Sequence, residues 1–388
     1  MATIAGSQFI ATAGLPVNVG FDSGGSPPPA VGGAFNLEVF VGAVGSAPPI
    51  APGYQGLAVL SPGGYTIDLI SGAYAITDNG TGGDSINADG TNETISGGSA
   101  FVNLTLNGNN DVANGGGLGG DYIQVNGTGD TVNGGTGPEA VNVNNSGDTV
   151  NGGSGSDTIT ATGNSNVIVG GSGPDTITAI GNGDTITGGT GPDLINVVGT
   201  GDSVTGGGGN DTLNVFGAGD TVNGGSGADT IGLYGTSDVA NGGSGPDTII
   251  LTGAGSTANS GGGNDTINLL GVGETANIGG LDTVNVSGSL DTVTAGASGT
   301  NSTGLVNLNG ATSFTFTDGP NTYSDTVTGF STAAGDTIHL TGSDTSSYAL
   351  AHSTAQNGGA DTLITLNDGS TIYLVGVNHA TVGPSFFS

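Results

Sequence analysis

The chain has 388 residues and a formal net charge of −32, because it contains 32 acidic residues and neither lysine nor arginine. Any charge that neutralises these carboxylates must come from outside the chain, and the lack of basic side chains argues against a nucleic-acid partner. The 83 glycines raise the entropy lost on folding, and the absence of cysteine excludes disulfides and thiolate metal sites. We therefore expect the chain to fold poorly without an added cation.

Residues 1–75 are rich in Ala, Pro and Val, and proline runs such as GSPPPA interrupt short apolar stretches. This pattern predicts strands separated by proline-containing loops. The segment is interpreted either as a cap on the structure that follows or as an assembly segment that docks on a neighbouring molecule by strand addition. The first residues lack the basic region and apolar core of a secretory signal, and no run of 18 apolar residues predicts a membrane span.

Residues 76–298 contain an internal repeat. Acidic residues recur every 18 residues at Asp157, Asp175, Asp193, Asp211 and Asp229, and a second acidic series lies midway between them, as at Asp184 and Asp202. The unit is therefore nine residues long. Thr, Ile and Val beside glycine clusters favour short strands joined by tight turns, so two units form one coil. The fold class predicted is all-β, a parallel β-solenoid with a β-rich N-terminal segment and a C-terminal β region.

Strand alternation predicts the apolar core of this solenoid. The Ile, Val or Leu that follows Asp-Thr or its equivalent should point inward. The predicted core residues are Ile159, Ile177, Ile195, Leu213, Ile231, Ile249 and Ile267 on one strand of each coil, with Val150, Ile168, Ile186, Val204 and Val222 on the other.

The repeats resemble the RTX (repeat-in-toxin) β-roll, whose nonapeptide is written GGxGxDxUx with U a large apolar residue. The match is close in GGSGSDTIT, GGSGPDTIT and GGTGPDLIN. The resemblance implies several Ca²⁺ ions held between successive coils by Asp carboxylates and by carbonyls of the glycine turn, and hard oxygen ligands of this kind suit calcium. The implied ligands lie at one edge of the roll, named here the GG edge: Gly116, Gly119, Asp121, Gly135, Glu139, Gly153, Gly155, Asp157, Gly171, Gly173, Asp175, Gly189, Gly191, Asp193, Gly207, Gly209, Asp211, Gly225, Gly227, Asp229, Gly243, Gly245, Asp247 and Asp265.

The other edge, named here the second edge, departs from the family pattern. Its turns lack the leading glycine pair, and Asn166 and Ser256 replace two acidic residues. We expect this edge to be partly or wholly free of metal. At both edges an alternative stays open, in which the Asp side chains only accept backbone hydrogen bonds in tight turns.

Two outward faces are predicted. One carries an apolar stripe, expected to be an interface with another protomer or with the chain's own ends: Ile180, Val198, Phe216, Tyr234 and Leu270. A register shifted by one residue would instead turn the stripe into core. The opposite face is a ladder of Thr and Asn that resembles the flat faces of ice-binding proteins, although Thr is also a common outward residue in any sheet.

Residues 299–388 are similar to the C-terminal segments of RTX proteins exported by type I secretion, including those that follow the roll in serralysin-like proteases. The resemblance implies an uncleaved export signal near the C-terminus, which GPSFFS fits loosely. His339, His352 and His379 are the histidines of the chain, and no HExxH or GxSxG motif accompanies them. We therefore expect a protein without enzymatic activity.

The hypothesis from the sequence is a secreted calcium-binding structural protein. It leaves a bacterial-type cell through type I secretion machinery, folds on extracellular Ca²⁺, and self-assembles into a filament or surface layer outside the cell or on its surface. The alternative is a monomeric calcium-dependent adhesin, or an ice- or surface-binding protein, that uses the Thr and Asn face.

Overall fold

The computed structural model describes residues 83–98, 101–117, 119–296, 303–309, 315–317, 322–341 and 344–388, together with the backbone of six strands between residues 17 and 78. The chain divides into two compact units, Met1–Gly171 and Ser172–Ser388. Both units are built from two parallel sheets, named here sheet A and sheet B, and the chain alternates between them.

In the first unit, sheet A contains β1 (Val17–Asp22), β2 (Phe35–Phe40), β4 (Gly56–Val59), β6 (Ala75–Asp78), β8 (Thr94–Ser96), β10 (Val112–Asn114), β12 (Thr131–Asn133), β14 (Thr149–Ser154) and β16 (Val167–Ser172). Sheet B contains β3 (Gly45–Ser46), β5 (Tyr65–Leu69), β7 (Asp84–Ala88), β9 (Val102–Leu106), β11 (Tyr122–Val125), β13 (Ala140–Val143) and β15 (Thr158–Thr162). Strands β1, β2, β4, β6 and β8 pair in parallel one after the other, so the strands before residue 79 extend the same stack.

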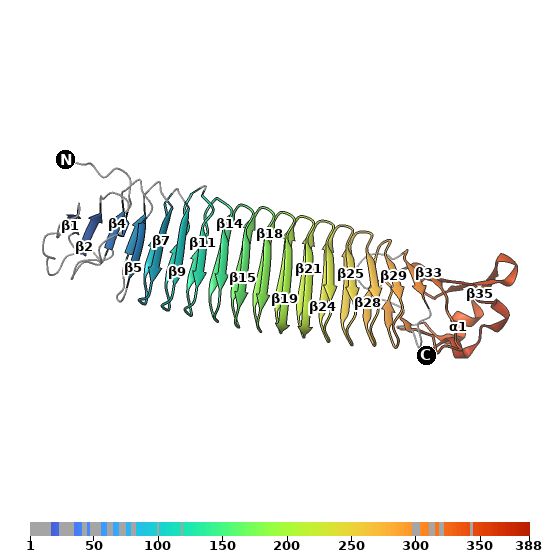
Figure 1. Ribbon diagram of the computed structural model, residues 1–388. Coiled ribbons are helices and arrows are strands. Elements are labelled where there is room, and N and C mark those ends of the chain that lie inside the picture. Colours follow the sequence, from blue (N-terminus) through green and yellow to red (C-terminus); the bar gives the residue numbers. More distant parts are fainter. Residues whose placement is uncertain are drawn as a thin grey trace. The chain divides into compact units, whose positions relative to one another are not determined.

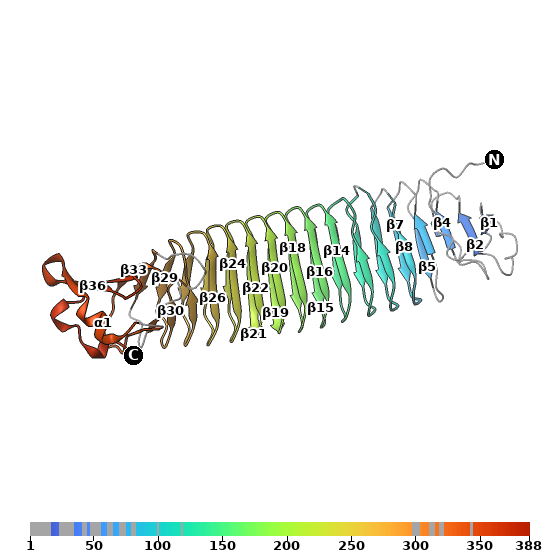
Figure 2. The ribbon, with the colours of Figure 1, turned by 180° about the vertical axis from the view of Figure 1, so that it is seen from behind.

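In the second unit, sheet A contains β18 (Thr185–Thr190), β20 (Ser203–Gly208), β22 (Thr221–Ser226), β24 (Val239–Ser244), β26 (Thr257–Gly262), β28 (Thr275–Asn277), β30 (Thr292–Thr294), β32 (Thr315–Thr317) and β34 (Thr337–His339). Sheet B contains β17 (Thr176–Ile180), β19 (Leu194–Thr200), β21 (Thr212–Ala218), β23 (Thr230–Leu233), β25 (Thr248–Leu251), β27 (Thr266–Leu269), β29 (Thr283–Val286), β31 (Leu305–Leu308) and β33 (Ser324–Thr328). Figure 1 shows these strands side by side in the order of the sequence, and Figure 2 shows β18 to β26 from the other side.

The pairing register follows the repeat. In β19 and β21, Ile195 pairs with Leu213 and Val197 with Val215, so each residue lies beside its equivalent one coil later. Identical residue types therefore stack along the sheet, and each strand shields the edge of the one before it. Both units are parallel β-solenoids with two strands per coil, which confirms the predicted fold class.

The core lies between the two sheets and is thin. All twelve core residues predicted from the alternation are at most 1% exposed, from Val150 to Ile267. Most strands present one or two inward apolar side chains, such as Ile195 and Val197 in β19. Each coil thus buries few apolar groups, and burial of this kind stabilises by only about 25 cal/mol per Å².

The C-terminal part of the second unit leaves the repeat. β37 (Thr371–Val375) pairs in parallel with β33, and β36 (Asp361–Thr365) and β35 (Ser353–Gln356) continue that sheet in antiparallel pairs. Helix α1 (Ser346–Ala351) has Thr345 as its N-cap, and the Thr345 hydroxyl accepts a hydrogen bond from the Tyr348 N–H. Three short 3₁₀ helices complete this part: η1 (Asn357–Gly359), η2 (His379–Thr381) and η3 (Pro384–Phe386). None of the helices in the described residues has the length and apolarity needed to cross a bilayer.

The predicted organisation into residues 1–75, 76–298 and 299–388 stays a prediction. Much of the first segment lies outside the described residues, and the side chains of its strands are not described. Its proposed role as a cap or assembly segment is therefore carried by the sequence alone. The export signal stays a prediction as well, although Phe386 is buried and stacks on Phe330 with 5.6 Å between the ring centroids.

The turns of the second edge share one backbone feature. The residue before the acidic position adopts a left-handed conformation, as in Gly201 (φ 69°), Gly219 (φ 73°) and Ser237 (φ 60°). At the last of these turns the position is taken by Leu290, which has φ 61° and is 62% exposed. A leucine is strained there, because its Cβ lies close to the following carbonyl.

Replacing Leu290 with Asn is expected to stabilise the calcium-loaded protein by about 1 kcal/mol, since Asn tolerates the left-handed conformation and the lost side chain is mostly solvated. Chemical denaturation at a fixed calcium concentration measures the change. Leu281→Asn is the matched control, because Leu281 is 57% exposed but lacks a positive φ. An equal gain in both variants would contradict the assignment of strain to Leu290.

Candidate functional site: two ladders of buried carboxylates

In the second unit the GG edge is a ladder of buried carboxylates, one before each sheet B strand from β17 to β27. Asp193, Asp211 and Asp229 are 1–3% exposed. Their side chains are tied to the backbone of the preceding coil. The Asp175 N–H donates to Asp193 Oδ1 at 2.8 Å, the Asp193 N–H to Asp211 Oδ1 at 2.9 Å, and the Asp211 N–H to Asp229 Oδ1 at 2.8 Å. One carboxylate oxygen in each coil therefore links two coils together.

The other carboxylate oxygen has no such bond. In the described part of the chain, no hydrogen-bond partner is found for Oδ2 of Asp193, Asp211, Asp229, Asp247 and Asp265, although each atom is buried. A buried acceptor without a partner is destabilising, and a buried charge without a partner far more so. These oxygens mark the places where the fold requires a cation or a proton.

Glycine carbonyls surround the same turns. Gly207 (φ 115°) and Gly209 (φ 134°) take conformations that L side chains rarely adopt. A Cβ on either residue would also lie about 2 Å from a carbonyl oxygen of the preceding coil, 2.2 Å from Gly189 O and 2.1 Å from Gly191 O. Only glycine lets these carbonyls stack so closely from coil to coil.

A third glycine makes room for the carboxylate itself. A Cβ on Gly206 would lie 2.4 Å from Asp211 Oδ2, and one on Gly188 would lie 2.4 Å from Asp193 Oδ2. The first glycine of each GG pair is therefore required because the unbonded oxygen occupies the place of a side chain. The glycine spacing of the repeat and the burial of the aspartates are two aspects of one packing arrangement.

The predicted GG-edge residues occupy equivalent turns in successive coils. Gly153, Gly155 and Gly171 of the first unit, and Gly173, Gly189, Gly191, Gly225, Gly227, Gly243 and Gly245 of the second, all have positive φ between 108° and 151°. Glu139 fits imperfectly, as expected: its longer side chain accepts a hydrogen bond from the Gly135 N–H at 3.0 Å, and its Oε2 has no partner in the described residues.

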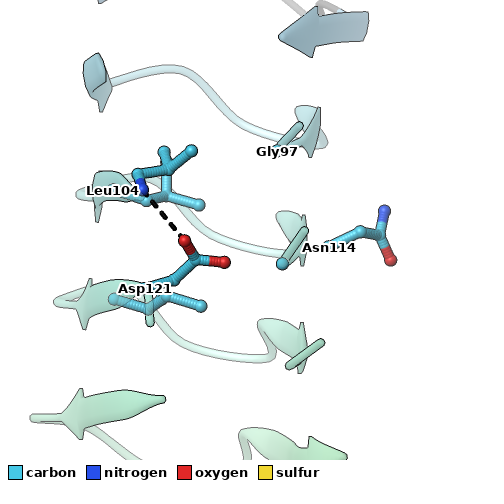
Figure 3. A pocket seen from close by; sticks show the side chains of 7 residues that line it. Gly97, Leu104, Asn114 and Asp121 are labelled. Atoms are coloured by element: carbon cyan, nitrogen blue, oxygen red, sulfur yellow. Dashed lines mark hydrogen bonds between the residues drawn. The ribbon is translucent and has the colours of Figure 1, made fainter. Parts of the chain in front are cut away.

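Asp121 differs from the other predicted ligands. Its Oδ1 accepts from the Val102 N–H and its Oδ2 from the Gly116 N–H, both at 2.9 Å. The coil before it carries Val102 at the acidic position. Asp121 instead lines a cavity of about 10 Å³ together with Leu104 and Ile123 (Figure 3), which is about the room that one water molecule needs. At this rung backbone N–H groups bond both carboxylate oxygens.

The second edge also carries a ladder of buried carboxylates, and the expectation that it is partly or wholly free of metal stays a prediction. The Asp184 N–H donates to Asp202 Oδ1 and the Asp202 N–H to Asp220 Oδ1, both at 2.8 Å. Oδ2 of Asp202, Asp220 and Asp238 is buried and has no partner in the described part of the chain. The same holds for Asp111, Asp130, Asp148 and Asp291 Oδ2 and for Glu274 Oε1.

The two replaced positions interrupt the ladder without breaking its backbone links. Asn166 Oδ1 accepts from the Asp148 N–H at 3.0 Å, and Ser256 Oγ accepts from the Asp238 N–H at 3.2 Å. Neither residue carries a charge. In the sequence, the acidic residues that recur midway between the GG-edge positions are the signal for these additional carboxylates.

Burial raises the pKa of several carboxyl groups at each edge. At the GG edge the pKa of Asp193 rises to about 6 and that of Asp265 to about 7, mainly through desolvation and further through neighbouring carboxylates. At the second edge the pKa of Asp202 rises to about 6 and that of Glu274 to about 7, again mainly through desolvation. The pKa of Glu139 rises to about 8, because burial and the neighbouring Asp157 carboxyl group both favour its protonated form. The fold thus disfavours the ionised carboxylates unless a cation compensates them.

A calcium ion fits this donor set. Among the described residues no three carboxylate or histidine side chains converge on one point, so an ion at either edge would also need backbone carbonyl oxygens. The stacked turns provide such carbonyls near the unbonded oxygens. A Cβ on Gly188 would lie 2.4 Å from Asp193 Oδ2 and 2.7 Å from the Gly206 carbonyl oxygen, and one on Gly206 would lie 2.4 Å from Asp211 Oδ2 and 2.6 Å from the Gly224 carbonyl oxygen. Carboxylate and carbonyl oxygens in a flexible glycine turn are the ligands that calcium prefers.

The five side chains of the predicted apolar stripe lie on the surface of sheet B in the second unit. Ile180, Val198, Phe216, Tyr234 and Leu270 are 42–48% exposed, so the register is not shifted into the core. Their role as an interface stays a prediction.

The histidines lie in the C-terminal part. His379 Nε2 is 3.3 Å from Ser353 Oγ, but that hydroxyl donates its proton to the Leu350 carbonyl at 2.9 Å. His352 stacks on Tyr348 and His339 Nδ1 lies 3.1 Å from the Ser388 carbonyl oxygen. These contacts are those of packed surface residues, and the expectation of a non-enzymatic protein stays a prediction.

No family model matches this chain, and no curated protein matches it. Among solved structures, the chain is similar to the extracellular lipase LipA from Serratia marcescens, with 16% sequence identity and a TM-score of 0.24. The match covers 56% of this chain and 40% of that lipase. A likeness at this level carries no argument about activity, substrate or metal, and the fold of this chain is a parallel β-solenoid on the evidence of its own strands.

Proposed function

We propose that this protein is a secreted calcium-binding structural protein, which folds when extracellular Ca²⁺ occupies the carboxylate ladders. One observation carries the proposal: carboxylate oxygens such as Oδ2 of Asp148, Asp193 and Asp211 are buried without a hydrogen-bond partner among the described residues, in a chain that has neither Lys nor Arg to neutralise them. Calcium bound between coils would supply that charge, and because it binds only the native state it would stabilise folding.

The location follows from the same linkage. Where calcium is scarce the acidic, glycine-rich chain stays unfolded and can be threaded through an export channel, and where calcium is abundant it folds. This supports a site of action outside the cell or on its surface, after export of the type I kind. In the folded roll, Asp193, Asp211 and their equivalents would hold the ions together with carbonyls of the intervening glycine turns.

We also propose that the folded protein assembles into a filament or surface layer. The stripe of exposed apolar side chains in sheet B supports an interface. Electron microscopy of the purified protein in calcium, and again after addition of a chelator, tests the proposal. Ordered polymers are expected only with calcium, and dispersed particles in both conditions would contradict assembly.

A second candidate function uses the outer face of sheet A. Asn side chains form hydrogen-bonded ladders there, with Asn259 Nδ2 donating to Asn241 Oδ1 and Asn277 Nδ2 to Asn259 Oδ1, both at 2.7 Å. Side chains held in register at the coil spacing favour binding to a regular surface, such as ice or the target of an adhesin. Growth of ice crystals in the presence of the folded, monomeric protein tests this alternative.

The metal sites can be tested by ion counting. Asp193→Ala combined with Asp211→Ala is expected to lower the number of calcium ions bound per chain by at least one, because adjacent rungs share the turn between them. Asp368→Ala is the matched control, since Asp368 is an exposed carboxylate that accepts bonds from Ser370 in a surface turn. Equilibrium dialysis measures the stoichiometry, and an unchanged value in the double variant would contradict the assignment.

A further inference from the structure

The apolar stripe occupies the same position in successive coils of the second unit. Ile180 pairs with Val198 and Val198 with Phe216 in the parallel register of β17, β19 and β21. The Phe216 and Tyr234 rings stack with 4.7 Å between their centroids and 14° between their planes. Thr252, also exposed, follows Tyr234, and Leu270 ends the series. Six rungs at about 4.8 Å give a stripe about 24 Å long.

The face around the stripe carries no charged side chain. In the sheet B strands from β17 to β27, the outward side chains are all uncharged: Thr, Asn, Leu, Ile, Gly and the stripe itself. All eleven acidic residues between positions 172 and 275 are buried in the turns, at 3% exposure or less. In a chain with a net charge of −32, this face therefore presents no side-chain charge that would repel an identical face.

The order of side chains along the stripe is symmetric in size about its centre. The aromatic pair Phe216 and Tyr234 lies in the middle, the β-branched residues Val198 and Thr252 flank it, and the larger aliphatic residues Ile180 and Leu270 lie at the two ends. A two-fold axis through the middle, parallel to the strands, would reverse one stripe on the other. Phe216 would then meet Tyr234 of the second copy while Tyr234 meets Phe216, which is the reciprocal pairing of an isologous interface.

The stacked rings also favour a second copy of this chain, rather than a flat ligand, as the partner of the stripe. Because Phe216 and Tyr234 are nearly parallel and stack on each other, each ring uses a face on its neighbour. The Tyr234 ring further lies over Gly232, where a Cβ would be 2.7 Å from ring atoms. The rings therefore have little free face left for a flat ligand, and what they expose is an apolar surface that a second copy can bury.

We propose that the stripe is the interface of an antiparallel homodimer, in which Phe216 of one copy packs on the partner's Tyr234, Val198 on the partner's Thr252, and Ile180 on the partner's Leu270. This interface deepens the assembly part of the proposed function, and it provides a two-fold contact from which larger assemblies grow through other surfaces.

Cysteine cross-linking tests the geometry, since the chain contains no cysteine of its own. Val198→Cys and Thr252→Cys are prepared as separate variants of the full chain in calcium and oxidised alone and as an equimolar mixture. Covalent dimers are expected in the mixture and not in either variant alone. Efficient dimers of Val198→Cys alone would show that the residue faces itself, and no cross-link in the mixture would mean that these rungs do not meet; either result overturns the proposal.

Light scattering in the presence of calcium measures the oligomeric state and so tests whether the stripe binds a second copy of the chain. At protein concentrations too low for polymers to form, the unmodified chain is expected to be a dimer, Phe216→Ser a monomer, and the matched control Phe101→Ser a dimer, because Phe101 is 49% exposed outside the stripe. Circular dichroism shows whether each variant is folded, so that a loss of folding is not mistaken for a loss of association. A folded, monomeric unmodified chain, or a dimer that survives Phe216→Ser, overturns this interface while leaving calcium-dependent folding intact. Polymers that persist in Phe216→Ser would retain the proposed assembly and reject only the stripe as its contact.

Discussion

Removal of calcium from the purified protein at about pH 7.5 is expected to abolish its β-sheet circular dichroism, and addition of calcium is expected to restore it. The physical reason lies in the ladders: each coil would otherwise bury ionised carboxylates such as Asp193 and Asp202 with one oxygen unbonded. The thin apolar core and the entropy of 83 glycines leave little stability to offset that cost. Exhaustive dialysis against a chelator, followed by calcium titration, measures the transition.

Magnesium provides the control for this experiment. It is smaller, requires near-octahedral geometry and gives up its water reluctantly, so at the same concentration it is expected to restore little or no structure. If the ions acted only by screening the negative charge of the chain, magnesium would restore as much structure as calcium. Full β-sheet signal and an unchanged Tm after removal of every divalent ion would contradict the central claim of calcium-dependent folding.

Acidification is expected to restore structure to the metal-free chain. The pKa of Asp193 rises on folding from its ordinary value near 3.8 to about 6, and that of Asp130 to about 7. The folded state therefore binds protons more tightly than the unfolded state, so stability is lost as the pH rises through about 6 to 7 and regained as the pH falls. Circular dichroism of the chelated protein, followed from about pH 7.5 down to about pH 5, measures the gain.

The calcium-loaded protein is expected to respond in the opposite direction. Protons compete with calcium for the same carboxylate oxygens, so calcium affinity should fall over the pH interval in which the metal-free chain gains structure. Calcium titrations at the two ends of the interval provide this comparison. A metal-free chain that gains structure as the pH rises would contradict the assignment of raised pKa values to the ladders.

The repeat by itself determined the fold class and the core. A nine-residue period with Asp-Thr followed by Ile or Val has room only for short strands. Two such strands form one coil, and residues such as Ile195 and Leu213 then lie in one inward column. This information is local, because each coil contacts mainly its neighbours and the pattern repeats. Residues 1–75 and 299–388 lack a regular period, and for that reason their sequence predicted strands but not their partners.

The candidate site was only partly determined in this way. The sequence located the GG-edge aspartates, but the same spacing made Asp121 look equivalent to Asp193, and it did not show which second-edge carboxylates keep an unbonded oxygen. Only the stacked coils decide these points, because the partner of each carboxylate is the backbone of a coil 18 or 19 residues away. Asp121 is satisfied by two N–H groups, whereas Asp193 and Asp202 keep one buried oxygen without a bond. The period of the sequence thus determines which residues become neighbours, and the packing of neighbouring coils determines which carboxylates still need a cation.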